Sequence, residues 1–176
     1  IRFYSSVLPN LYKFVLKQSQ VFATEALNEH QRTLRMRGRP KIVLARSYEE
    51  AMHLYNRYEK NVLGVITDAR YPREGIVDPM AGIKLMAEIR KHDLFVPLIL
   101  QSAEVENKNY VGRYGASFVD KNSKKMDVDL RDIVSDNFGF GDFIFRNPDT
   151  LEEVARVRNL KELQNIIFSI PRESFL

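Results

Sequence analysis

Hydrophobic residues are arranged along this chain in two alternating patterns: short apolar runs and longer stretches with helical spacing. The runs are KIVLAR (residues 41–46), VLGVIT (62–67), VPLILQ (96–101) and SFVD (117–120). They are apolar almost throughout rather than alternately apolar and polar, which is typical of strands buried on both faces of a parallel sheet. The pattern therefore predicts four parallel strands.

Amphipathic helices are predicted around these strands, because apolar residues recur there at spacings of three and four. A long helix is expected at residues 8–37, ended by Gly38 and Pro40. Shorter helices should follow each strand, at residues 47–61, 80–89, 107–114 and 126–134. Ser47 and Glu50 have the spacing of a capping box at the start of the first of these.

The alternation of strand and helix predicts an α/β fold with a parallel sheet covered by helices on both faces. Beyond Asn137 the pattern changes. Residues 141–147 and 152–159 (GDFIFRN and EEVARVRN) predict an antiparallel hairpin, followed by a final helix around residues 160–167. We therefore expect an α/β domain at residues 1–136 and a hairpin-helix extension at residues 137–176.

Composition narrows the class of protein. With 44% hydrophobic and 28% charged residues among 176, the chain has the balance of a globular protein. No apolar run approaches the roughly 18 residues that span a bilayer, so a cytoplasmic location without membrane attachment is expected. The absence of cysteine excludes disulfides and zinc-thiolate sites. The three histidines are scattered and the net charge of +4 is modest, which favours neither a histidine metal cluster nor a nucleic-acid partner.

Three predicted strands are followed by polar side chains that suit phosphoryl transfer. Asp68, Ser102 and Lys121 each come directly after an apolar run. In an open parallel sheet, ligands bind outside the carboxyl ends of the strands, so these side chains should converge on one edge. A carboxylate can act as the nucleophile, while a hydroxyl and an ammonium group can hold phosphoryl oxygens.

The motifs around these residues resemble response-regulator receiver domains. VITDARYP is similar to the acceptor strand of that family, with Asp68 at the acceptor position. VPLILQSA resembles the fourth strand, with Ser102 as the hydroxyl residue, and GASFVDK resembles the fifth, with Lys121 as the lysine and Phe118 at the aromatic switch position. The resemblance covers roughly residues 1–136.

The resemblance implies a flavodoxin-like (CheY-like) doubly wound sheet and a regulatory domain rather than an enzyme. Asp68 would accept a phosphoryl group from a histidine kinase or phosphotransfer protein, and Ser102 and Lys121 would hold the phosphoryl oxygens. Mg²⁺ would bind the carboxylate of Asp68 and the backbone carbonyl of Arg70. Movement of Ser102 and Phe118 would then act as the switch.

The sequence also departs from the receiver pattern. The family's acidic pair of metal ligands follows a first strand that precedes the first helix, and neither is present here. In the strand order 2-1-3-4-5 that strand is central. The loop between Asp68 and Gly82 looks longer than usual, and Asn122 replaces a usual proline. We therefore expect weak Mg²⁺ binding by this chain alone, and a stronger site in an intact parent protein.

Other interpretations remain open. The chain could be a degenerate pseudo-receiver that regulates or docks within a larger multidomain protein, such as one of the phosphoenolpyruvate synthase or pyruvate, phosphate dikinase type. An enzyme or nucleotide binder is less favoured, because no glycine-rich phosphate loop is present. Asp68 could be a loop carboxylate, Ser102 an ordinary loop residue, Lys121 part of an exposed basic loop, and Phe118 plain core.

The long first helix is a candidate association surface. Phe22 and Leu27 lie in its second half, which a sheet of ordinary strand length would not cover. A second copy of the chain, a neighbouring domain of a parent protein or the residues of the C-terminal extension could cover this apolar stripe.

Overall fold

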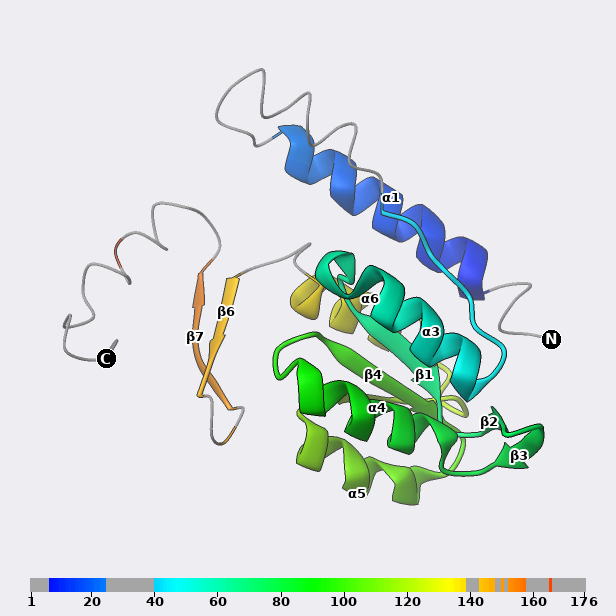
Figure 1. Ribbon diagram of the computed structural model, residues 1–176. Helices are drawn as coiled ribbons and strands as arrows, with labels where there is room; N and C mark the ends of the chain where they lie inside the picture. The colour runs from blue at the N-terminus through cyan, green and yellow to red at the C-terminus, as the bar shows by residue number, and fades with distance from the viewer. Residues whose placement is uncertain are drawn as a thin grey trace.

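A three-stranded parallel sheet forms the centre of the molecule (Figure 1). The computed structural model describes residues 7–24, 40–138, 143–147, 150, 152–157 and 165. The strand order is β1-β4-β5, with β1 at Val65–Asp68, β4 at Leu98–Ser102 and β5 at Ser117–Asp120. Both strand pairs are parallel. The prediction of an α/β fold with a parallel sheet is confirmed.

Helices cover both faces of this sheet. On one face lie α3 (Tyr48–Tyr58), α4 (Ala81–His92) and the short α5 (Lys108–Val111), which is flanked by the 3-10 helices η3 (Val105–Asn107) and η4 (Gly112–Tyr114). On the other face lie α1 (Leu8–Thr24) and α6 (Met126–Asn137). A further 3-10 turn, η2 (Glu59–Asn61), follows α3. The result is a three-layer α/β/α arrangement.

The pleat of β4 divides the core into two clusters. Leu98 and Leu100 pack with α3, α4 and α5, in what we call the front cluster. Ile99 packs with α1 and α6, in what we call the back cluster. All three residues are at most 2% exposed, as expected for the central strand of a covered sheet. Because successive side chains of a strand point to opposite faces, the faces taken by these three residues also determine the face of each residue at the end of the strand.

The start of α3 is the one predicted from its capping residues. The backbone N–H of Glu50 donates to the Ser47 hydroxyl at 3.2 Å, and the Glu50 carboxylate accepts from the backbone N–H of Arg46 at 2.6 Å. The first bond satisfies a backbone donor that a helix N-terminus leaves unpaired, and the second pairs the N–H of the residue before the N-cap. The local sequence was therefore sufficient to place this boundary.

The predicted strand KIVLAR is wrong. Residues 40–45 have no regular secondary structure, and Val43 and Leu44 are 54% and 45% exposed. Only Ile42 packs against the back cluster. Within the described part of the chain β1 is an edge strand, and this segment does not pair with its free edge, so it lacks the hydrogen-bonded ladder of a strand.

The first helix and the C-terminal region are described only in part. α1 is confirmed over Leu8–Thr24, whereas its predicted continuation to residue 37 lies outside the described residues, as do Leu27 and the side chain of Phe22. The predicted hairpin is confirmed as the antiparallel pair β6 (Phe143–Arg146) and β7 (Glu153–Val157), and the final helix lies outside the described residues. No helix in the described ranges is both long and apolar enough to cross a bilayer.

The loop after β1 contains a second hairpin that the sequence did not predict. β2 (Tyr71–Arg73) and β3 (Ile76–Asp78) pair antiparallel across the two residues Glu74 and Gly75. Both of these residues have positive φ, 54° and 77°. Two successive residues with positive φ are typical of a type I′ turn, whose twist matches that of a hairpin.

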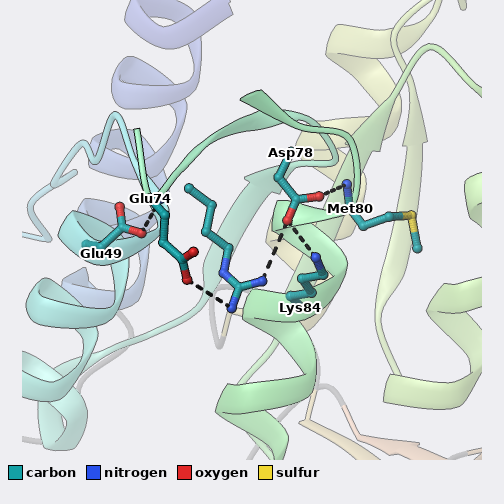
Figure 2. Close-up of polar contacts among 6 residues, drawn as sticks. Glu49, Glu74, Asp78, Met80 and Lys84 are labelled. Atoms are coloured by element: carbon teal, nitrogen blue, oxygen red, sulfur yellow. Dashed lines mark hydrogen bonds and ion pairs between the residues drawn. The ribbon is translucent and has the colours of Figure 1, made fainter. Parts of the chain in front are cut away.

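Polar contacts hold this hairpin against two helices (Figure 2). The backbone N–H of Glu74 donates to the Glu49 carboxylate in the first turn of α3 at 2.8 Å. Asp78 accepts from Lys84 Nζ at 2.7 Å and from the backbone N–H of Met80 at 2.9 Å. The hydrogen bond from Lys84 is the main cause that lowers the pKa of Asp78. The loop between β1 and α4 is therefore anchored.

We expect Glu74→Asn to stabilise the protein by about 0.5–1 kcal/mol. A glutamate is strained at positive φ, whereas asparagine tolerates this conformation and Asn-Gly is the preferred type I′ pair. The midpoint of urea unfolding should rise. Gly75→Ala is the matched control: its new Cβ meets no atom of the described residues within 4 Å but is added at φ 77°, so the midpoint should fall. An unchanged midpoint for Glu74→Asn would contradict the expectation.

Candidate functional site

An ion pair joins two strand ends at the carboxyl edge of the sheet. Asp68 is the last residue of β1, and Lys121 directly follows β5. The Lys121 ammonium donates to the Asp68 carboxylate. The side chain of Lys121 is 30% exposed and that of Asp68 is 42% exposed, so solvent reaches the pair from the edge. The sequence prediction that these residues lie close together is confirmed.

The backbone fixes the geometry of this edge. Asp68 pairs with Gln101, and Ser102 pairs with Asp120. The ladder continues one residue beyond each strand, because the N–H of Ala69 donates to the Gln101 carbonyl at 3.0 Å and the N–H of Lys121 donates to the Ser102 carbonyl at 2.9 Å. The ion pair is therefore held by the ends of rigid strands rather than by loops alone.

Ser102 reaches the same edge, but its hydroxyl has other partners. The side chain is 4% exposed, and Oγ accepts from Asn107 Nδ2 at 2.9 Å and from the backbone N–H of Glu104 at 3.0 Å. The pleat that puts Leu98 and Leu100 in the front cluster also directs Ser102 to that side. A role for Ser102 in holding phosphoryl oxygens would require it to turn from Asn107, and that role stays a prediction.

Gln101 is a polar residue of this edge that our sequence interpretation missed. It is paired with Asp68 on one side and with Val119 on the other, and it is 3% exposed. Its Nε2 atom is buried and has no hydrogen-bond partner among the described residues. The signal in the sequence was a glutamine ending the otherwise apolar run VPLILQ. The sequence analysis treated it only as the last residue of that predicted strand.

Phe118 is partly buried and packs against the front cluster. This contact agrees with the interpretation of Phe118 as core. A core position does not exclude a change of rotamer when the site is occupied. The assignment of Phe118 as a switch residue stays a prediction.

The backbone after Asp68 is supported by two hydroxyl groups. The Thr67 hydroxyl donates to the Asp68 carbonyl at 3.0 Å and lies 3.3 Å from the Tyr71 hydroxyl. Burial is the largest cause that raises the pKa of Tyr71 to about 12, so this phenol stays protonated at neutral pH. The two side chains therefore position the chain between β1 and β2 without adding charge to the site.

The donor set at this edge suits Mg²⁺ poorly. The resemblance implied the carboxylate of Asp68 and the carbonyl of Arg70 as ligands, which is far short of the six oxygens of an octahedral shell unless water supplies the rest. Over the described ranges no group of three or more histidine, aspartate or glutamate side chains could hold a metal ion. Lys121 also occupies one oxygen of Asp68.

Searches of protein-family models, of curated proteins and of solved structures found no match to this chain. Its function is therefore inferred from the geometry of this edge and from the three motifs.

Proposed function

We propose that this chain is a receiver-like regulatory domain in which Asp68 accepts a phosphoryl group from a histidine kinase or a phosphotransfer protein. The observation that carries the proposal is the ion pair between Asp68 and Lys121, located where the carboxyl ends of three parallel strands meet. Ligand sites of open parallel sheets are found at this edge.

Asp68 and Lys121 are the groups of this chain that would take part in the transfer. An oxygen of the Asp68 carboxylate attacks the phosphorus of a phosphohistidine, a P–O bond forms, the P–N bond breaks, and the imidazole leaves as the neutral base after taking up a proton from water. The product carries about −1.5 to −2 charges at neutral pH. Lys121, released from the carboxylate oxygen, neutralises part of this charge through contacts with phosphoryl oxygens.

A second candidate is a pseudo-receiver that acts as a regulatory or docking module without phosphorylation, within a multidomain protein such as one of the phosphoenolpyruvate synthase type. The incomplete set of oxygen ligands beside Asp68 favours it. Receiver chemistry on Mg²⁺ would be slow with so few carboxylates. The two candidates differ in whether Asp68 is modified at all.

Labelling with acetyl phosphate at increasing Mg²⁺ concentration tests the proposal. We expect slow and partial addition of one phosphoryl group, measured by intact mass, that increases with Mg²⁺ and is abolished in Asp68→Asn. Asp120→Asn is the matched control, because Asp120 is a carboxylate at the end of β5 that accepts from the backbone N–H of Asn122 at 2.8 Å. This variant should be labelled like the wild type.

Two results would contradict the proposal. Wild-type protein that stays unlabelled at every Mg²⁺ concentration would favour the pseudo-receiver. Labelling that persists in Asp68→Asn would mean that another residue is the acceptor.

A further inference from the structure

The buried amide of Gln101 is an unexplained feature of the carboxyl edge. Its Nε2 atom is one of two buried side-chain nitrogen or oxygen atoms without a hydrogen-bond partner over the described residues, and the other is the Tyr55 hydroxyl. An unpaired buried polar group lowers stability, because it loses its hydrogen bonds to water without replacement. Such a group calls for a reason other than packing.

The sheet register places Gln101 on the same face of the sheet as Asp68. Paired residues in neighbouring parallel strands direct their side chains to the same face. Ile66 and Ile99 both belong to the back cluster, so Asp68 and Gln101, two residues further along each strand, are on that face as well. β4 lies between β1 and β5, so the ion pair from Asp68 to Lys121 passes across the end of β4 where Gln101 is found.

The chemistry of an amide nitrogen defines the class of missing partner. The Nε2 group donates two hydrogen bonds and accepts none, so its partner must offer an acceptor. An oxyanion of the phosphoryl type between Asp68 and Lys121 would offer several acceptor oxygens. Lys121 would supply the positive charge, and the buried amide would supply direction.

We propose that Gln101 is a binding residue that donates a hydrogen bond to an oxygen of the phosphoryl group carried by Asp68. This inference rests on the proposed function for the identity of that group. The unpaired Nε2 lowers the stability of the unmodified protein, and the same atom then serves as a donor when Asp68 is phosphorylated. A residue held for this purpose should improve stability when it is made apolar and weaken oxyanion binding at the same time.

The first measurement is thermal unfolding of the wild type and of Gln101→Met, which keeps a similar length without the amide. We expect an equal or higher Tm, because the variant removes a buried group that lacks a partner. Tyr55→Phe is the matched control, since it removes the other such group, in the front cluster. Its Tm should also be equal or higher.

Gln101→Leu repeats the test with a branched side chain if methionine packs badly. A clear fall in Tm in both Gln101 variants would show that the amide is satisfied, and would overturn the inference.

The second measurement is binding of inorganic phosphate, without metal or covalent chemistry. In Asp68→Ala the carboxylate is removed and Lys121 loses its partner, so free phosphate can occupy the position of the phosphoryl group. Phosphate should shift the amide NMR signals of Ala69, Gln101 and Lys121. Adding Gln101→Met should weaken this binding about tenfold, as expected for one hydrogen bond to a charged group. Adding Tyr55→Phe should leave the affinity unchanged.

The outcomes separate this inference from the proposed function. Equal phosphate affinity with and without Gln101→Met, or no phosphate binding to Asp68→Ala at all, overturns the role of Gln101 whatever the labelling of Asp68. A tenfold loss in a protein that acetyl phosphate never labels would keep Gln101 as an oxyanion-binding residue and reject the phosphoacceptor.

Discussion

Gly82→Ala should destabilise the protein by about 3 kcal/mol, although alanine normally stabilises a helix relative to glycine by about 1 kcal/mol. Gly82 is buried in the first turn of α4. A Cβ on it would lie 1.9 Å from the backbone oxygen of Asp68 and 2.9 Å from its carbonyl carbon. Backbone cannot turn away as a flexible side chain can, so either α4 or the end of β1 must move.

The same substitution should disturb the candidate site. The N–H of Gly82 donates to the Ala69 carbonyl at 3.1 Å, which joins the start of α4 to the chain directly after Asp68. A shift that accommodates the new methyl group moves Asp68 relative to Lys121. The amide NMR signals of Asp68 and Lys121 should therefore change, and labelling by acetyl phosphate should fall.

Gly112→Ala is the matched control for this prediction. A Cβ at Gly112 meets no atom of the described residues within 4 Å, and the φ of Gly112, −59°, suits any L-residue. Its free energy of unfolding from urea titration should be unchanged or up to about 1 kcal/mol higher. A Gly82→Ala variant as stable as Gly112→Ala would show that the approach of α4 to Asp68 is not tight.

Local signals predicted much of the fold. The run SFVD became β5 at its predicted bounds, and Ser47 with Glu50 marked the start of α3. Both depend on nearby residues, through apolar character in one case and capping in the other. Residues 41–46 have similar apolar character but pair with no strand over the described residues, and pairing is not encoded locally.

The hairpin after β1 was missed because its turn lacks the usual sequence. Glu74 takes a positive φ that is ordinarily associated with asparagine, aspartate or glycine, and Pro72 is unusual within a strand. Strands of three residues also give too few positions for an alternating pattern. Contacts from Glu49 and Lys84 stabilise the hairpin, and the sequence pattern reveals neither of them.

The sequence predicted only the part of the site that depends on where the strands end. The meeting of Asp68 and Lys121 follows from the general geometry of parallel sheets. The division between Gln101 and Ser102 depends on the phase of the pleat, and a shift of one residue exchanges the two faces. The predicted strand at residues 96–101 became β4 at Leu98–Ser102, so the sequence could not assign that phase.

We expect loss of the Arg90 side chain to lower the free energy of unfolding by about as much as the clash at Gly82. Its guanidinium donates from Nε to the Tyr114 carbonyl at 2.6 Å, and from Nη1 to the carbonyls of Val96 at 2.8 Å and Asp93 at 3.0 Å. These bonds tie the end of α4 to η4 and to the segment that enters β4. Burial lowers the pKa of Arg90, but an arginine remains charged at neutral pH.

Arg90→Met should destabilise the protein by about 3 kcal/mol, measured by urea unfolding. Hydrogen bonds from a charged group contribute about 1.5–3 kcal/mol each, and partial exposure together with non-additivity keeps the total below their sum. Arg90→Lys should restore only part of this loss, because one ammonium group cannot match the fixed fork of a guanidinium to carbonyls in separate segments. Lys91→Met is the matched control, since Lys91 is 65% exposed and pairs only with Glu88 at 2.6 Å among the described residues. That variant should stay within about 0.5 kcal/mol of the wild type.

An Arg90→Met variant no less stable than Lys91→Met would mean that water serves the three carbonyls equally well, and that the end of α4 is held by its apolar contacts alone.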